Sequence, residues 1–216
     1  MAYELNGTDQ FFSMASSPVT TMPLTMACWF NSTNTTTAQV LMCLNSAASS
    51  NRYLMSARGD LAGDPIRIAA VGTTGSGVSA DTTSGYSSGL WTHSCGVFTS
   101  STSRTAYING GSSATNTTNV AVAGIIQASI GAQRFNLFSS GTSFTTGLIA
   151  EVGIWNAALT ATEVASLAKG MTCDKVRPQS LVFYAPLVRD INDQKGGLTI
   201  TNNNGATVAT HPRVYA

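Results

Sequence analysis

Carboxylates are the first side chains to examine for chemistry, because two carboxyl groups about 5–5.5 Å apart hydrolyse glycosides with retention of configuration. Glu151 is followed by the four non-acidic residues 152–155, so its own segment offers no acidic partner. Three more carboxylates lie in Gly-rich segments that are typical of solvated turns: Asp60, Asp64 and Asp81. The sequence therefore predicts no catalysis by paired carboxylates.

The sequence lacks the usual motifs of nucleophilic catalysis and of zinc binding. The chain has two histidines, no G-x-S-x-G segment and no His/Cys pair with zinc-ligand spacing. His93 alternates with Trp91 and Cys95, a pattern that favours a hydrogen-bonded core histidine. The four cysteines form no CxxC pair and two of them, Cys28 and Cys95, lie in apolar strand patterns, so we expect buried, reduced thiols. We predict that the protein is not an enzyme.

The composition narrows the class of partner. The formal net charge is +1 and no basic cluster occurs, so we expect no nucleic-acid partner. No apolar run approaches the roughly 18 residues of a membrane helix, so we expect no membrane partner. The first residues lack a charged and apolar leader, which predicts synthesis in the cytoplasm without a standard export signal.

The elements that would position any site are mostly β-strands. Apolar and polar residues alternate over 24–30 and 91–97, with the period of two typical of strands. Residues 104–108 run into Asn109-Gly110-Gly111, which predicts a hairpin because Asn and Gly accept positive φ. Further strands are predicted at 39–44, 66–71, 120–123, 128–132, 148–155, 181–187 and 198–201. Strands at this spacing over 216 residues predict one all-β sandwich or barrel domain, 1–216, with a C-terminal tail at about 202–216.

One helix interrupts the strands. Thr160 and Glu163 have the spacing of a capping box, in which each side chain satisfies a backbone N–H of the first turn. An apolar face of Val164, Leu167 and Ala168 follows, and Gly170 suits the residue that ends a helix. The pattern predicts a short helix on the surface of the sandwich.

Three segments occur in an order and spacing that carry a family pattern. They are LTMACWF at 24–30, WTHSCGVF at 91–98 with RTAYING at 104–110, and GLIAEVGIWNAALT at 147–160. Together they resemble the concanavalin A-like, laminin-G-type jelly-roll family over roughly residues 2–170. The resemblance implies a two-sheet antiparallel jelly-roll sandwich with one short surface helix. Segment 181–187 is similar to the closing strand, which would pair near the N-terminal strand.

The same resemblance implies calcium, which is the usual ion of that family and takes hard oxygen ligands. The candidate ligands are Glu151, Asp60, Asp64 and Asp81. This chain has Ala150 where the relatives often carry Asp, and the alternative is an ordinary contact of Glu151 with the backbone. No cofactor other than calcium is expected.

A sugar site needs an exposed aromatic ring to stack on the sugar, together with polar groups from loops. Aromatic residues in loop-like contexts are Tyr53, Tyr86, Phe135 and Phe138. The alternative is that Phe135 and Phe138 pack under their own loop.

Two functions are compatible with these observations. The first is a non-enzymatic structural protein on a virion surface, as a capsid decoration subunit of a tailed bacteriophage, because segment 202–215 resembles the tails of jelly-roll proteins in phage genomes. The second is a lectin-like carbohydrate-binding module of a receptor-binding fibre, with surface glycans as its partner; it follows from the family alone.

The C-terminal segment carries the expectation of assembly. Arg213 and Tyr215 are of the residue types enriched in interfaces, so we expect them to contact a neighbouring subunit of a homo-oligomer or another capsid protein. The alternative is a tail that folds back on the edge of its own sandwich.

Overall fold

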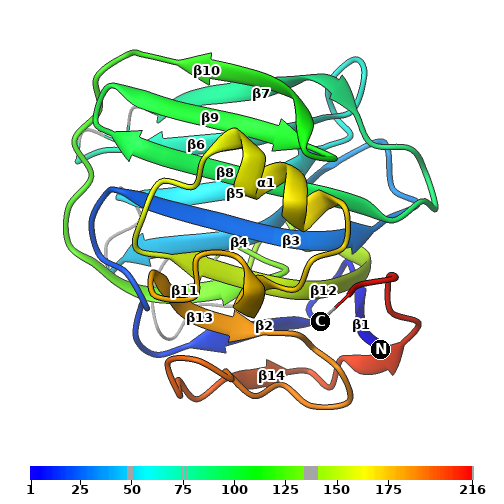
Figure 1. Ribbon diagram of the computed structural model, residues 1–216. Helices are drawn as coiled ribbons and strands as arrows, with labels where there is room; N and C mark the ends of the chain where they lie inside the picture. Colours follow the sequence, from blue (N-terminus) through cyan, green and yellow to red (C-terminus); the bar gives the residue numbers. More distant parts are fainter. Residues whose placement is uncertain (48–50, 74, 76, 134–140, 216) are drawn as a thin grey trace.

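The computed structural model describes residues 1–47, 51–73, 75, 77–133 and 141–215, which form two antiparallel β-sheets packed face to face (Figure 1). Within these residues, sheet A has eight strands and sheet B has seven. Sheet A contains β1 (Ala2–Asn6), β3 (Leu24–Asn31), β8 (Thr92–Ser100), β9 (Ser103–Ile108), β10 (Gly111–Asn116), β12 (Thr146–Trp155), β13 (Leu181–Ala185) and β15 (Thr207–Ala209). Sheet B contains β2 (Phe11–Met14), β4 (Ala38–Ser46), β5 (Arg52–Arg58), β6 (Pro65–Val71), β7 (Gly77–Gly85), β11 (Ile125–Ile130) and β14 (Thr201–Asn203).

Neighbouring strands are far apart in the chain, as a jelly roll requires. Sheet A has the order β10-β9-β8-β3-β12-β1-β15, and β13 also pairs with β12. Sheet B has the order β14-β2-β11-β4-β5-β6-β7. The predicted two-sheet antiparallel sandwich is confirmed, and β13 does lie near the N-terminal strand, because β1 and β13 pair with successive parts of β12.

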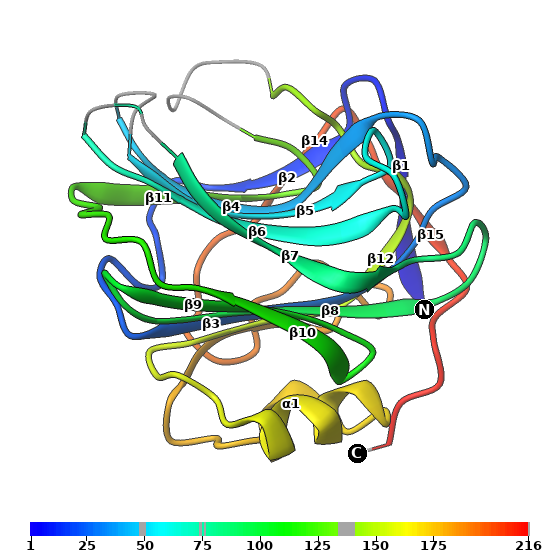
Figure 2. The same ribbon diagram turned by 90° about the horizontal axis from the view of Figure 1, so that it is seen from above.

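The main core lies between the sheets. The alternation in β3 places Leu24, Met26, Cys28 and Phe30 in this core, all fully buried. The outer face of sheet A is covered as well, by α1 (Ala161–Ala168) and the short 3₁₀ helix η1 (Cys173–Lys175), which lie below it in Figure 2. A second apolar cluster fills that space and includes Ala27, Val97, Trp155, Val164 and Leu167. Sheet A is therefore buried on both faces where α1 and η1 cover it.

The predicted capping box of α1 is confirmed. The Thr160 hydroxyl accepts from the Glu163 N–H at 3.3 Å, and a carboxylate oxygen of Glu163 accepts from the Thr160 N–H at 2.7 Å. Arg177 donates two further bonds to Glu163, at 2.8 and 2.7 Å, and so connects the helix to the segment that follows η1. Burial opposes ionisation, but the bonds from Thr160 and Arg177 hold the pKa of Glu163 below its ordinary value.

Replacing Glu163 by alanine is expected to lower the free energy of unfolding by about 1–2 kcal/mol, since it removes a cap and a paired carboxylate. Glu163→Gln is the matched control, because glutamine keeps an acceptor for the cap and loses only the charge. We expect about half the loss for Glu163→Gln in urea denaturation. Equal stability of Glu163→Ala and the wild type would contradict this role.

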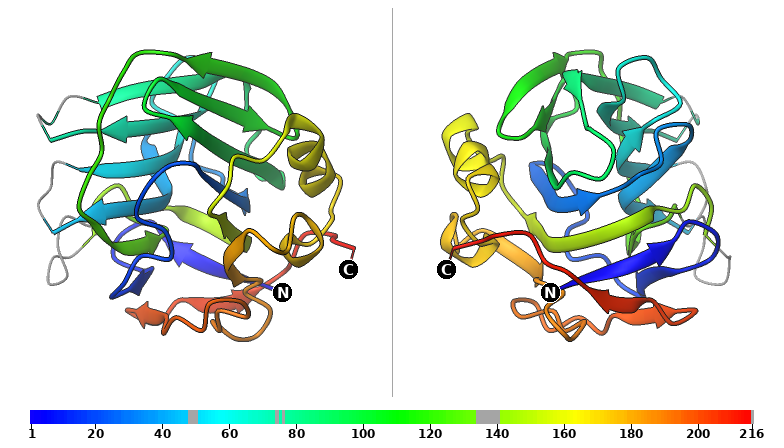
Figure 3. Two further views of the ribbon diagram at one scale, coloured as in Figure 1. Left: turned by 60° about the vertical axis from the view of Figure 1, so that its left-hand side comes forward. Right: turned by 90° about the vertical axis from the view of Figure 1, so that its right-hand side faces the viewer.

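The ends of the chain join the sandwich. β15 pairs with β1, and β14 pairs with β2, so the first and last strands lie side by side (Figure 3). The predicted tail is therefore not free over 201–209, and the alternative of a tail that folds back on its own sandwich describes this part. The segment after β15 continues to the side of sheet A that carries α1 (Figure 2).

The strand predicted at 120–123 is wrong. Val120 is buried in the core, but the Ala123 N–H donates to the Asn51 side chain at 3.3 Å rather than to a neighbouring strand. Gly124 then adopts a φ of +67°, and the strand of this region, β11, begins only at Ile125.

The four cysteines are buried free thiols, and their burial is as predicted. Burial raises the pKa of Cys28 to about 12 despite a hydrogen bond with Ser94. His93 is buried against Trp29, with ring centroids 5.4 Å apart, and burial lowers its pKa to about 3, so the ring is neutral. In the described residues, no helix is both long and apolar enough to cross a membrane.

Candidate functional site

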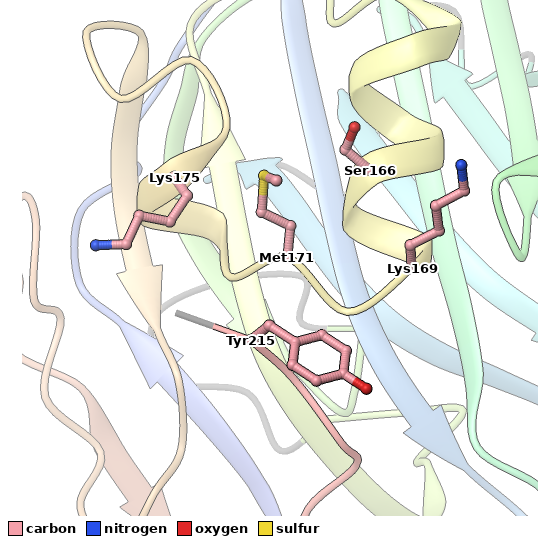
Figure 4. Close-up of a pocket in the computed structure, with 5 residues that line it drawn as sticks. All are labelled: Ser166, Lys169, Met171, Lys175 and Tyr215. Atoms are coloured by element: carbon pink, nitrogen blue, oxygen red, sulfur yellow. The ribbon is translucent and has the colours of Figure 1, made fainter.

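A pocket of about 440 Å³ opens beside α1, on the outer side of sheet A. Five residues line it: Ser166, Lys169, Met171, Lys175 and Tyr215. Figure 4 shows Met171 between the two lysines, which lie on opposite sides, with the Tyr215 ring below. The Tyr215 side chain is 66 % exposed and Met171 is 42 % exposed, so the pocket presents an apolar floor with cationic edges.

The end of α1 shapes one wall. Gly170 adopts a φ of +97°, which suits glycine, and its N–H donates to Leu167 O at 2.9 Å. The Met171 N–H then donates to Ser166 O at 3.2 Å, which holds Met171 beside the last turn of the helix. The sequence predicted this helix end correctly.

The C-terminal segment supplies the other wall. Tyr215 forms a parallel bridge with Met171: its N–H donates to Gly170 O at 2.5 Å, and the Thr172 N–H donates to Tyr215 O at 3.2 Å. A Cβ on Gly170 would lie 3.1 Å from the Tyr215 ring, so glycine is also what allows the ring to approach. Tyr215 is thus placed by two backbone hydrogen bonds and by close packing.

A buried polar cluster anchors the segment that carries Tyr215. Glu151, which is 4 % exposed, accepts from the Tyr184 hydroxyl at 2.7 Å. Its other carboxylate oxygen lies 3.3 Å from His211 Nε2. Burial, and next the negative charge of Glu151, raises the pKa of Tyr184, so its hydroxyl stays protonated and donates. Burial and the same carboxylate raise the pKa of Cys173.

The backbone at Glu151 explains how its side chain reaches this cluster. Glu151 has a φ of +51° and lies where the register between β12 and β3 shifts, as in a β-bulge. Its N–H donates to Pro186 O at 3.2 Å. Glu151 lies between the part of β12 that pairs with β1 and the part that pairs with β13. The bulge aims the carboxylate toward β13 and the C-terminal segment.

The charges around the pocket are mostly positive. Lys169 and Lys175 line it and Arg213 is an exposed neighbour of Tyr215 in the chain. Asp174 offsets part of this charge, since it lies 3.1 Å from the Lys175 ammonium. The ion pair is about half exposed, so water screens it and Lys175 can exchange partners.

The structure buries two of the aromatic residues that the sequence analysis predicted to bind sugar. Tyr53 is fully buried in β5, with its ring 5.1 Å from that of Phe98. Tyr86 is buried against Phe30, and its hydroxyl donates to Asn34 O at 2.6 Å. Tyr53 lies on β5 with its ring in the core, and Tyr86 follows the end of β7 and packs its ring into the same core. Phe135 and Phe138 lie outside the described residues.

The structure does not bring the four predicted calcium ligands together. Glu151 is engaged by Tyr184 and His211 beside sheet A, whereas Asp81 lies on β7 of sheet B. Asp81 forms a two-bond ion pair with Arg67 at 2.6 Å, and Asp60 forms one with Arg58 at 2.7 Å. Within the described ranges, no three side chains of His, Cys, Asp or Glu are grouped to hold a metal. The four predicted side chains therefore do not form one calcium site, and the Glu151 carboxylate contacts the side chains of Tyr184 and His211.

A second polar region lies on the outward face of sheet B. Gln127 and Asn45 are opposite each other on β11 and β4, and Ser56 lies on β5. Among the described residues, Gln127 Oε1, Asn45 Oδ1 and Ser56 Oγ are buried without a hydrogen-bond partner. The side chains of these three residues carry no charge, and none of them is an aromatic ring.

Comparison with known proteins defines the class of this fold. A family model described as the concanavalin A-like lectin/glucanases superfamily matches residues 6–165. The chain therefore belongs to this superfamily, as the resemblance of its three segments predicts. No curated protein sequence matches the chain significantly.

Solved structures with the same fold include a pentraxin, a putative carbohydrate binding protein and a domain of an arabinanase. The native heptameric SAP-like pentraxin from Limulus polyphemus has a TM-score of 0.71 at 15 % identity, over 97 % of this chain and 94 % of that chain. A putative carbohydrate binding protein from Bacteroides ovatus has a TM-score of 0.61 at 18 % identity, over 98 % and 62 %. Domain 4 of AbnA, a GH43 extracellular arabinanase from Geobacillus stearothermophilus solved with arabinotriose, has a TM-score of 0.61 at 21 % identity, over 77 % and 76 %. At these identities the likeness establishes the fold.

Proposed function

We propose that this chain is a non-catalytic carbohydrate-binding domain and that its sugar site is the pocket beside α1. The observation that carries the proposal is the Tyr215 ring, which is 66 % exposed at the pocket and yet held by backbone bonds to Gly170 and Thr172. A rigid, exposed ring is what stacking on the apolar face of a sugar requires, because little conformational freedom is lost on binding. The carbohydrate-binding proteins among the structural neighbours support the same class of ligand.

Several groups argue against catalysis. Glu151 is buried, with both of its oxygens engaged, so a substrate does not reach it. The His93 ring is buried and neutral, and the thiol of Cys173 is buried with a raised pKa. A general acid or base needs contact with its substrate, and a thiol nucleophile needs a lowered pKa. These groups are better suited to holding the fold.

The charge of the pocket favours a sugar that carries a carboxylate. Lys169 and Lys175 supply two positive charges at the edges of the pocket, against the one negative charge of Asp174 beside Lys175. Exposed lysines attract an anion at modest strength, and the interaction weakens as salt screens it. The ligand class is therefore an acidic saccharide whose ring stacks on Tyr215 while its carboxylate faces a lysine.

The direct test is a screen of neutral and carboxylate-bearing saccharides, followed by calorimetric titration of the best ligand with the wild type and Tyr215→Ala. We expect the substitution to weaken binding about 10-fold or more, since a stacked ring contributes roughly 1.5 kcal/mol or more. Leu90→Ala is the matched control, because it removes an exposed apolar side chain, 61 % exposed, that does not line the pocket. Unchanged affinity in Tyr215→Ala would contradict the site.

The role as a virion protein remains a prediction. The location of the protein on a particle surface and its oligomeric partners are predictions as well. If Arg213 and Tyr215 contact a neighbouring subunit, the double substitution Arg213→Ala/Tyr215→Ala would abolish assembly while keeping β15 paired with β1 in sheet A. The sugar site and this contact would use the same exposed ring.

A further inference from the structure

The His211 ring is surrounded by acceptors. Its Nδ1 lies 2.8 Å from Pro212 O, and its Nε2 lies 3.3 Å from Glu151 Oε1 and 3.4 Å from Pro186 O. All three atoms are oxygens without a hydrogen to donate. Each ring nitrogen therefore needs its own N–H to satisfy the oxygen opposite it.

Only one protonation state of the ring provides both N–H groups. A neutral imidazole donates from one nitrogen and accepts at the other, whereas an imidazolium donates from both. With a neutral ring, either Pro212 O or the Glu151 carboxylate would face a lone pair. The positive charge also balances the Glu151 carboxylate, whose second oxygen already accepts from Tyr184.

Other titratable groups around the contact do not replace His211. Tyr184 on β13 and Cys173 on η1 keep their protons, because burial and then Glu151 raise the pKa of both. Asp174 adds a more distant negative charge that acts on both groups. Burial lowers the pKa of the α-amino group of Met1, and Arg189 acts in the same direction, while Glu151 opposes the shift. Among these groups, His211 is the one whose side chain pairs with the second carboxylate oxygen of Glu151.

In the sequence, His211 lies four residues before Tyr215, which lines the pocket. Four residues, 210–213, separate the end of β15 from Val214, which precedes Tyr215, and His211 is in that stretch with the buried Pro212. Between β15 and the Tyr215 bridge, the His211 side chain contacts the sandwich at the Glu151 carboxylate and at Pro186 O. These contacts and the bridge between Tyr215 and Met171 together hold the segment that carries Tyr215.

We infer that His211 and Glu151 are the positioning residues of the pocket: the imidazolium–carboxylate contact docks the C-terminal segment and presents Tyr215. Saccharide binding would then follow the protonation of His211, a coupling that rests on the proposed function. An imidazolium donates from both ring nitrogens whereas a neutral imidazole donates from one, so protonation of the ring strengthens docking and loss of that proton weakens it.

The test reads the docked segment directly, without a ligand. Amide exchange of Tyr215 and Thr172 is measured by NMR at pH 6 and pH 8 and corrected for intrinsic exchange, because both amides are bonded only while the segment is docked. We expect protection to fall about 10-fold between these pH values in the wild type and to be lower but independent of pH in His211→Gln. The amides of β4 in the core are the internal reference.

Glu151→Gln provides a second variant, since glutamine keeps an acceptor for Tyr184 and loses the charge that pairs with His211. It is expected to flatten the pH profile as well. Constant protection of Tyr215 and Thr172 in the wild type, or the same pH profile in His211→Gln, would overturn the inference even if Glu151→Gln does not fold.

Saccharide titration at the same pH values separates the inference from the proposed function. Affinity that falls with the protection of Tyr215 supports both. Affinity that stays constant while protection falls overturns the coupling. Absence of saccharide binding at every pH, with protection that still follows His211, overturns the proposed function and supports the positioning role.

Discussion

Replacing Tyr53 by alanine is expected to lower the free energy of unfolding by about 3–5 kcal/mol, the cost typical of deleting a large buried ring. The side chain is fully buried and contacts Phe98 edge to face at 5.1 Å. Burial raises the pKa of its hydroxyl to about 12, which fits an apolar setting. Urea denaturation of the purified variant measures the loss, and saccharide affinity of the folded fraction should be unchanged.

Tyr53→Phe is the control for that experiment. The Tyr53 hydroxyl is buried and has no hydrogen-bond partner among the described residues, so its removal is expected to change stability by less than about 1 kcal/mol. If Tyr53→Ala instead left stability intact and abolished saccharide binding, Tyr53 would be a ligand contact and not a core residue.

Reversing the two lysine charges of the pocket is expected to produce the largest effect on binding. In the double variant Lys169→Glu/Lys175→Glu, an acidic saccharide would face two negative charges in place of the two positive charges of the wild type. At a separation of about 6 Å in water, each reversal costs roughly 1.4 kcal/mol before screening, so affinity should fall about 10- to 100-fold. Calorimetric titration at low salt measures this loss, and added salt should reduce it.

Two controls accompany the charge reversal. Lys195→Glu changes the net charge equally on an exposed lysine outside the pocket and should leave affinity nearly unchanged. A neutral saccharide that stacks on Tyr215 should bind the double variant and the wild type about equally. An equal loss for Lys195→Glu would indicate a general effect of net charge and would contradict a specific anion site.

Strong local patterns predicted the elements of the fold that depend on few partners. The alternation in β3, the Asn109-Gly110 turn and the Thr160–Glu163 capping box each fix a local conformation, and all three occur as predicted. Strand β7 was missed because its segment is rich in Gly, Ser and Thr, and only pairing with β6 makes it a strand. The wrong strand at 120–123 has a buried valine but no neighbouring strand to pair with its backbone.

The candidate site was predictable only in part. Tyr215 and Arg213 stand out by residue type, but their place beside Met171 depends on a bridge between segments about forty residues apart. The contact of Glu151 with Tyr184 and His211 depends on a bulge in β12 that no local pattern announces. Tyr53 was misplaced because the strand β5 was not recognised, and an inward-facing ring was taken for one on a loop.

The most direct test of the central claim is chemical-shift mapping of the ¹⁵N-labelled protein during titration with a carboxylate-bearing saccharide. If the pocket beside α1 is the sugar site, the largest shifts will fall on the backbone amides of Gly170, Met171, Thr172, Lys175 and Tyr215. If the largest shifts fall instead on Gln127, Asn45 and Ser56, the sugar binds the outward face of sheet B, and the site proposed here is contradicted.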